Sequence, residues 1–473
     1  MATTSHSQRY FQKGSPQYPK WANYTPPQPD QRKRQVTWKK GLLLTLAGLV
    51  LFAFTMGGWF PSTWFVRVQS LSPHSPHANS LQTSSLQEKY WTHEFNDLTD
   101  FTLEEHLDAK SSISRQLTGR VHIERAPHEQ DSEIAVKVTL ACPSQSQWDG
   151  ISVKATSSSI LIENAPPVSK PDLSRCVLDI SISVAPGLKL AVFKTDTRYL
   201  GIDLEANLRL SVSDVATLRA TSSSITSHME PSSLLATRFH IETASGGITG
   251  GFSQLDTLDI KSNSGTLNIT PFPDRPSKLD SSFFPSPDPH CNLVVSSSSG
   301  SVHIDQPIPH FGHPLPCPDY TTDIHTSSGS ISGTYILGSK CALHAHSGGI
   351  RASILPMAAD AKMELITETN SGGVDVDVMA AYGDAEKPVK DLWGRHATMS
   401  GSLKVEYPRA WEGEISAKAV SGSIRVDGEG VEVEDGRDGG FGKSIRARKG
   451  NGNGELSLES MSGSVVAHIR RVR

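Results

Sequence analysis

Alternating apolar and polar residues mark several short strands in the first half of the chain. Val121-His122-Ile123, Ile134–Val138 and Leu178–Val184 each place an apolar side chain at every second position. A period of two residues is typical of a β-strand with one buried face. No segment beyond residue 110 has the 3.6-residue period of an amphipathic helix. The pattern therefore predicts an all-β domain.

A four-residue motif, Ser-Gly-x-apolar, recurs nine times in the second half of the chain. The motif serines are Ser245, Ser264, Ser299, Ser328, Ser347, Ser371, Ser400, Ser421 and Ser462. Successive serines are 19, 35, 29, 19, 24, 29, 21 and 41 residues apart, and long intervals contain insertions such as Pro271–His290 and Gln306–Tyr320. Degenerate copies, Ser-Ser-Ser-Ile, begin at Ser157 and Ser222. The uninterrupted unit is thus about 20 residues long.

The residues around each motif serine keep one register, which Ser/Gly-rich low-complexity sequence has no reason to do. Two residues before the serine only small side chains occur: Thr243, Ser262, Ser297, Thr326, Ala345, Thr369, Thr398, Ala419 and Ser460. Three residues after it only aliphatic side chains occur: Ile248, Leu267, Val302, Ile331, Ile350, Val374, Leu403, Ile424 and Val465. Each copy therefore predicts a strand, a Ser-Gly corner and a second strand.

A unit of this length with two or three short strands is typical of one coil of a β-solenoid. Coils would stack at about 4.8 Å, so that equivalent residues form ladders. Glycine would supply the backbone freedom that each corner needs. Parallel crossovers are almost always right-handed, so we expect a right-handed parallel β-helix.

One segment near the N-terminus has a different character. Residues 41–60 read GLLLTLAGLVLFAFTMGGWF, without a charge and long enough to cross a bilayer as a helix. Trp38 precedes this run and Trp64 and Phe65 follow it, as interfacial aromatic residues do. A cleaved signal peptide is the alternative. The long charged leader and the absence of an Ala-x-Ala site favour a transmembrane helix.

The charge distribution predicts how this helix is oriented. Of 45 basic and 49 acidic residues, eight basic and one acidic precede Gly41, so the tail carries +7 and the remainder of the chain −11. Basic flanks stay in the cytoplasm, which makes everything after the span extracellular or lumenal. A net-negative ectodomain also disfavours nucleic acid as a partner.

These observations predict four regions. Residues 1–40, rich in Gln, Pro and basic residues, form a disordered cytoplasmic tail. A transmembrane helix occupies 41–60, and a stalk occupies 61–90. The solenoid ectodomain occupies 91–473, with regular Ser-Gly repeats over 241–473.

All five cysteines lie on the side of the predicted membrane where disulfides form. Cys142 with Cys176 is the natural first pair. Only two of the other three cysteines, Cys291, Cys317 and Cys341, can pair with each other. Cys291 with Cys317 is one candidate pair, and the sequence alone does not decide which pair forms. Asn268 begins an Asn-x-Thr sequon on the same side and is a candidate glycosylation site.

Several groups of residues raise the question of chemistry. His325, His344 and Glu368 occupy the same repeat position in successive coils. They could hold a metal, but a solvated outward ladder is the preferred interpretation, so no metal or cofactor is predicted. Asp375 and Asp377 share a strand face, and paired carboxylates act as acid and base in β-helical polysaccharide hydrolases. Alternating Asp is also what an exposed strand presents.

A phosphate-binding loop is nearly present but fails on spacing. Gly442-Lys443-Ser444 follows Gly436 with five intervening residues, whereas the P-loop has four. No Gly-x-Ser-x-Gly nucleophile elbow occurs. No catalytic residues are therefore predicted.

The recurring Ser-Gly-x-apolar units, entered through Ile182–Leu190 (ISVAPGLKL), resemble the putative adhesin family of β-helical domains. The likeness covers roughly residues 119–472, and the membrane-anchored layout resembles fungal members. The resemblance implies a non-enzymatic ectodomain that recognises a surface glycan or protein, or presents a structure. It supplies no catalytic residues to transfer. The alternative is a carbohydrate-active β-helical enzyme that acts on cell-wall polysaccharide.

Overall fold

The computed structural model describes residues 86–107, 117–143, 145–165, 176–273, 290–308, 317, 319–383, 385–439 and 442–470. These residues belong to one compact unit, Leu81–Arg473. Their regular elements are β-strands joined by turns and short connections, apart from the four-residue helix α2 (Gln145–Trp148). The prediction of an all-β domain is confirmed.

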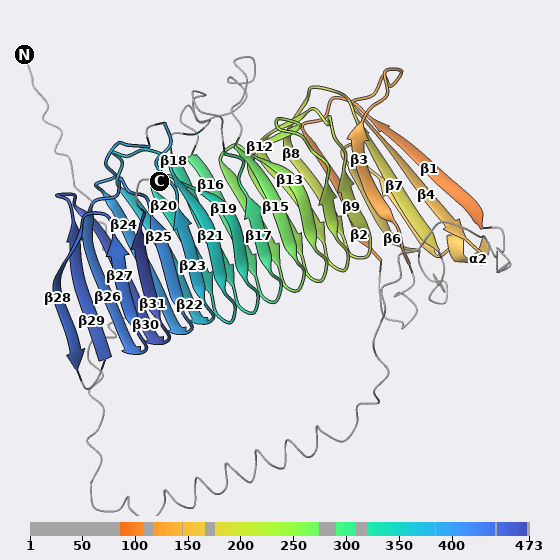
Figure 1. The fold of residues 1–473 in the computed structure, drawn as a ribbon. Helices are drawn as coiled ribbons and strands as arrows, with labels where there is room; N and C mark the ends of the chain where they lie inside the picture. Colours follow the sequence, from red (N-terminus) through yellow and green to blue (C-terminus); the bar gives the residue numbers. More distant parts are fainter. Residues whose placement is uncertain are drawn as a thin grey trace, which may run out of the picture. The chain divides into compact units, whose positions relative to one another are not determined.

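The strands form two long sheets (Figure 1). In spatial order, sheet A contains β1 (Gln87–Phe95), β4 (Ile134–Cys142), β7 (Val177–Val184), β3 (Arg120–Arg125), β9 (Gly201–Leu204), β11 (Ile225–Ser227), β13 (Ile248–Gln254), β15 (Leu267–Pro273), β17 (Val302–Asp305), β19 (Ile331–Leu337), β21 (Ile350–Pro356), β23 (Val374–Val378), β25 (Leu403–Tyr407), β31 (Val465–Ile469) and β27 (Ile424–Gly428). Sheet B contains β28 (Val431–Gly439), β29 (Gly442–Lys449), β26 (Gly413–Ser421), β30 (Gly454–Ser462), β24 (Leu392–Ser400), β22 (Met363–Ser371), β20 (Lys340–Ala345), β18 (Asp319–Thr326), β16 (His290–Ser297), β14 (Thr257–Ser262), β12 (Leu234–Thr243), β10 (Leu210–Ala220), β8 (Leu188–Thr197), β2 (Asp100–His106), β6 (Ser159–Asn164) and β5 (Ile151–Ala155).

Each Ser-Gly motif is the corner between a strand of sheet B and the next strand of sheet A. Neighbouring coils pair in parallel and in register, so that Ile331 aligns with Ile350 and Ile350 with Val374. The small residues two before the serine are at most 5% exposed, and the aliphatic residues three after it are buried except Ile424 on the edge strand β27. The predicted inward register and the ladders are confirmed. The tight turns follow one another along the lower edge in Figure 1.

The corner glycines were expected to supply backbone freedom, but the structure gives a different reason for them. Of the nine, only Gly422 and Gly463 have a positive φ, so most corners do not require a glycine conformation. A Cβ on Gly348, however, would come closer than 3.0 Å to the backbone carbonyl of Gly329 in the preceding coil. Glycine is therefore required because the coils approach one another too closely for a side chain.

The last Ser-Gly coil departs from sequence order. Strands β30 and β31 pair with β24 and β25 on one side and with β26 and β27 on the other. The coil of β30 and β31 therefore lies between the coil of β24 and β25 and the coil of β26 and β27, although it comes after both in the sequence. Between these two passages β28 and β29 form an antiparallel hairpin along β26. Our expectation of successive coils was wrong for this unit.

The other end of the unit is also closed by antiparallel strands. Strands β1, β4 and β7 pair antiparallel in sheet A. Ser157, read as a degenerate corner, instead lies in the turn between the antiparallel strands β5 and β6. Thr156 Oγ1 accepts a hydrogen bond from the backbone N–H of Ser159 and fixes this turn. Ser222, by contrast, precedes a parallel strand, β11, and is part of a coil corner.

The cysteines within the described residues are all buried. The structure joins Cys142 to Cys176, with Cα atoms 4.4 Å apart, and Cys291 to Cys317, with Cα atoms 6.0 Å apart. Cys341 is a free thiol, and burial raises its pKa to about 12. A thiol so far from ionising is an inert part of the core.

The predicted tail 1–40 and membrane span 41–60 lie outside the described residues. Within the described ranges, no helix is long and apolar enough to cross a membrane. Strand β1 begins at Gln87, inside the segment predicted as a stalk.

Candidate functional site

One outward ladder of side chains runs along sheet B at the position three residues before each motif serine. In spatial order it consists of Glu242, Lys261, Ser296, His325, His344, Glu368, Ala397, Glu459 and Lys418. The parallel register holds each member opposite the next, about 4.8 Å away along the stack. The ladder places the predicted trio of His325, His344 and Glu368 on three adjacent strands.

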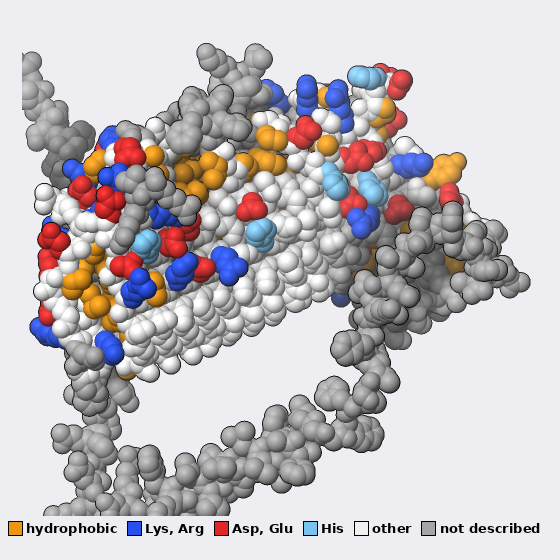
Figure 2. Space-filling model, viewed as in Figure 1, with side chains coloured by type: hydrophobic (Ala, Val, Ile, Leu, Met, Phe, Trp, Pro, Cys, Tyr) orange, Lys and Arg blue, Asp and Glu red, His pale blue; other side chains and the backbone are white. Residues whose placement is uncertain are grey.

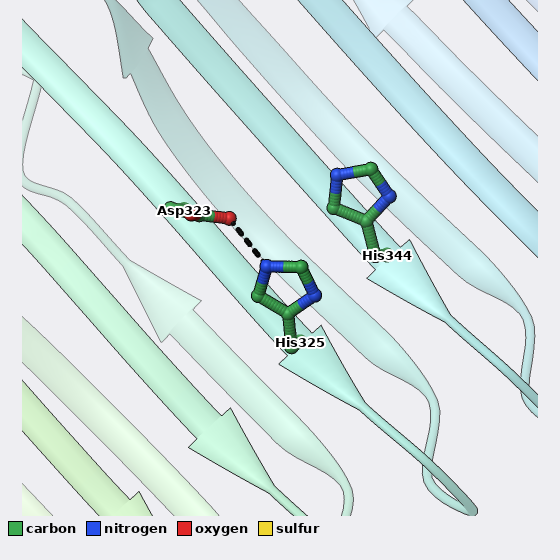
Figure 3. A group of neighbouring side chains, drawn as sticks. All are labelled: Asp323, His325 and His344. Atoms are coloured by element: carbon green, nitrogen blue, oxygen red, sulfur yellow. Dashed lines mark ion pairs between the residues drawn. The ribbon is translucent and has the colours of Figure 1, made fainter. Parts of the chain in front are cut away.

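The two histidines of this ladder lie face to face. Their ring centroids are 4.7 Å apart and their planes differ by 9°. Asp323, two residues before His325 on the same face of β18, places Oδ1 2.8 Å from His325 Nε2 (Figure 3). The parallel strands thus bring two imidazoles and a carboxylate into one small patch.

Glu368 links the histidine pair to the next coil. Its Oε2 lies 3.5 Å from His344 Nδ1, and its Oε1 lies 3.3 Å from Arg395 Nε on β24. The hydrogen bond with His344, and then the Arg395 charge, lower the pKa of Glu368, although partial burial opposes them. Glu368 is consequently an ionised carboxylate fixed between two cationic or hydrogen-bonding neighbours.

A hollow of about 500 Å³, here called the polar groove, is lined by His325, His344 and Glu368. Hydroxyl, amide, imidazole and charged groups line it from β12 to β22, among them Asn263, Ser298, His346 and Asn370. Asn370 Nδ2 and His346 Nδ1 are 2.8 Å apart across neighbouring coils.

The face of the unit drawn in Figure 2 carries charged side chains of both signs beside a pale strip of uncharged side chains and backbone.

A second hollow, here called the apolar groove, continues from the first and encloses about 710 Å³. Both grooves are lined by Glu368 and Asn370, so they meet there. Met399, Val420 and Met461, one residue before their motif serines, are each more than half exposed in it. The outer surface of sheet B thus changes from polar to apolar toward the C-terminal coils.

The predicted acid pair lies elsewhere. Asp375 and Asp377 belong to β23 of sheet A. Asp375 pairs with Arg351 at 3.7 Å and with Lys404 at 3.9 Å, and Asp377 pairs with Arg470. Each carboxylate is thus balanced by basic side chains of other coils.

The remaining sequence candidates also have definite places. Gly442-Lys443-Ser444 begins strand β29, which pairs antiparallel with β26, so no helix N-terminus is present to receive a phosphate. Asn268 is exposed on β15 of sheet A. It therefore projects from the sheet that does not carry the two grooves.

Sequence reasoning missed two members of the site, Asp323 and Arg395. Both stand five residues before a motif serine, at an outward position of the strand alternation. Extending the aligned register by two residues would have placed Asp323 beside His325. Met399, Val420 and Met461 were also visible as an apolar column in that alignment.

Comparison with protein-family models finds no match, and comparison with curated proteins finds none either. The chain is similar to a solved structure described as a putative cell adhesion protein from Clostridium sporogenes, with 10% identity and a TM-score of 0.15 over 81% of this chain and 99% of that chain. It is also similar to a putative adhesin from Parabacteroides merdae, with 6% identity and a TM-score of 0.18 over 67% of this chain and 96% of that chain. TM-scores this low carry no information about the function of this chain.

Proposed function

We propose that this chain is a single-pass membrane protein with a cytoplasmic N-terminus, and that its β-solenoid binds a cell-surface glycan without catalysing a reaction. The glycan would lie in the polar groove. The observation that carries this proposal is the groove itself, which offers hydroxyl, amide, imidazole and carboxylate groups on successive coils. A repeating polar polymer can be contacted by a repeating polar ladder at several points at once.

The membrane topology is supported by the sequence. An uncharged 20-residue run follows a tail of charge +7, the layout by which the chain resembles membrane-anchored fungal members of the adhesin family. Disulfides at Cys142–Cys176 and Cys291–Cys317 suit an oxidising compartment. Asn268 would then be glycosylated, on the sheet opposite the groove.

Binding of the full-length chain to an array of cell-surface polysaccharides tests the glycan. We expect the double substitution His346→Ala with Asn370→Ala to weaken binding, because both side chains line the polar groove. A matched control is His303→Ala with Ser332→Ala, which removes a similar hydrogen-bonded pair, 3.0 Å apart, from sheet A. Equal losses in both variants, or binding to proteins but to no glycan, would contradict the proposal.

Two further measurements separate the alternatives. In sealed membranes the solenoid and residues 1–40 should lie on opposite sides. A protease added outside should therefore digest one of them and leave the other intact. Hydrolysis of a bound polysaccharide that is abolished by Asp375→Asn or Asp377→Asn would instead support a carbohydrate-active enzyme.

A further inference from the structure

Three potential metal ligands converge beside the polar groove, which two of them, His325 and His344, line. One ligand atom from each of Asp323, His325 and His344 lies within 4.8 Å of the other two. Asp323 and His325 are two positions apart on β18, and His344 is the register partner of His325 on β20. Because parallel pairing fixes all three positions, the group depends on no loop conformation.

The separations suit a single ion after small side-chain rotations. Tetrahedral zinc, with bonds of about 2.0 Å, holds its ligand atoms about 3.3 Å apart. The Asp323–His325 distance of 2.8 Å is already close to this value. The ring of His344 must turn toward the pair, and its side chain, 30% exposed, borders open groove into which it can turn.

We propose that Asp323, His325 and His344 bind a divalent transition-metal ion, with zinc as the reference ion. Two imidazoles and one carboxylate suit zinc, copper or nickel, whereas calcium and magnesium prefer oxygen ligands alone. Three protein ligands leave a coordination position open to the groove. Glu368, 3.5 Å from His344 Nδ1, positions that imidazole in the manner of an outer carboxylate.

Other histidines on the solenoid surface have acidic neighbours but lack a second imidazole. His303 lies 3.0 Å from Asp305, two residues away on β17, and its register partner on β19 is Ser332. His240 lies 3.1 Å from Asp259 on the next coil. Within the described ranges, the group of Asp323, His325 and His344 is where three such donors come together. The His303–Asp305 pair is therefore a matched control.

The test uses the untagged full-length chain, freed of metal with a chelator. Titration with Zn²⁺ by calorimetry should give one site per chain, and Co²⁺ should develop the visible absorption of a four-coordinate site. We expect His325→Asn and His344→Asn each to lower Zn²⁺ affinity by more than about tenfold, and Glu368→Gln by roughly tenfold with the stoichiometry kept. Circular dichroism spectra of the variants would check that each of them is folded.

The control His303→Asn should leave Zn²⁺ affinity unchanged. The proposal is overturned if the folded chain binds no Zn²⁺, or if His303→Asn reduces binding as much as His325→Asn. Neither titration contains a glycan. Failure of the metal site therefore leaves the glycan proposal untouched, and loss of glycan binding leaves the metal site untouched.

Discussion

His396 and Tyr407 are hydrogen-bonded inside the solenoid, with 2.9 Å between His396 Nε2 and the Tyr407 hydroxyl. The other ring nitrogen, Nδ1, lies 2.8 Å from Thr367 Oγ1. His396 and Tyr407 are fully buried. Burial lowers the pKa of His396 to about 3 and raises that of Tyr407 well above its usual value. The interior therefore contains a neutral imidazole whose two nitrogens are both satisfied.

This pair predicts a specific loss of stability in acid. An unfolded histidine takes up a proton below its ordinary pKa of 6.5, whereas His396 in the folded chain resists protonation down to about 3. The contribution of His396 to the free energy of unfolding is thus fully present above pH 6.5. It falls by about 1.4 kcal/mol per pH unit as the pH drops from 6.5 toward 3. Urea unfolding at a series of pH values measures this slope.

The substitution His396→Gln isolates the effect. Glutamine can keep a hydrogen bond to Thr367 or Tyr407 but does not titrate. We expect the variant to be less stable at pH 7 and to lose stability less steeply between pH 6.5 and 4. An unchanged slope would show that other groups dominate the acid response.

The inward register can be tested at one coil. Replacing Ile331 by Asp places an unpaired carboxylate in the interior, where the native side chain has no exposure. We expect the domain to lose several kcal/mol of stability or to fail to fold. Arg351 is 84% exposed and lies beside Asp375, so Arg351→Glu should change stability by no more than about 1 kcal/mol. Similar thermal melts for the two variants would contradict the register.

We expect the corner glycines not to tolerate substitution, because there is no space for a side chain between the coils. In Gly348→Ala the new methyl group would meet the backbone of the preceding corner, so we expect a loss of at least 1–3 kcal/mol, roughly the cost of overpacking. Gly436→Ala, on β28, meets nothing within 4 Å and should be nearly neutral. Chemical denaturation of both variants compares them directly. Comparable losses of stability in the two variants would mean that backbone conformation, rather than contact between coils, determines the cost of replacing glycine.

The unexpected order of the last coil can be tested by crosslinking. Ser402 Oγ and Ser464 Oγ lie 3.2 Å apart on neighbouring coils, and a Cys pair at these positions should form a disulfide. Ser423 lies one coil further away, at roughly 10 Å from Ser402 by strand spacing. Cysteines at 402 and 423 should therefore stay reduced. Gel mobility with and without reductant distinguishes the two pairs, and the opposite result would restore sequential stacking.

The aligned motif allowed the coil to be predicted almost completely. Small residues such as Thr326 and aliphatic residues such as Ile350 occupy equivalent positions because each must fit the same narrow interior. His396 stands at an inward position where most other coils have Ile, Leu or Val. Its role depends on Tyr407, eleven residues away, and on Thr367 of the preceding coil, so no local pattern could show it.

Strand order and the ends of the stack could not be predicted. The units at Ser400, Ser421 and Ser462 carry the same pattern, so any of them could pair with any other. Only the competing pairing energies of whole strands decide that β30 lies between β24 and β26. The Ser157 turn looked like a corner because a hairpin and a coil corner both favour short polar residues.

The interior place of β30 and β31 has a consequence for synthesis. A ribosome completes β26 and β27 before these two strands exist, so the growing chain passes through a stage in which β24 and β26 each lack a partner on the side that β30 later occupies. Unpaired strand edges invite association with other chains. We expect nascent chains that stop before residue 454 to aggregate or to be degraded, because β30 and β31 are made only after the strands on both sides of them.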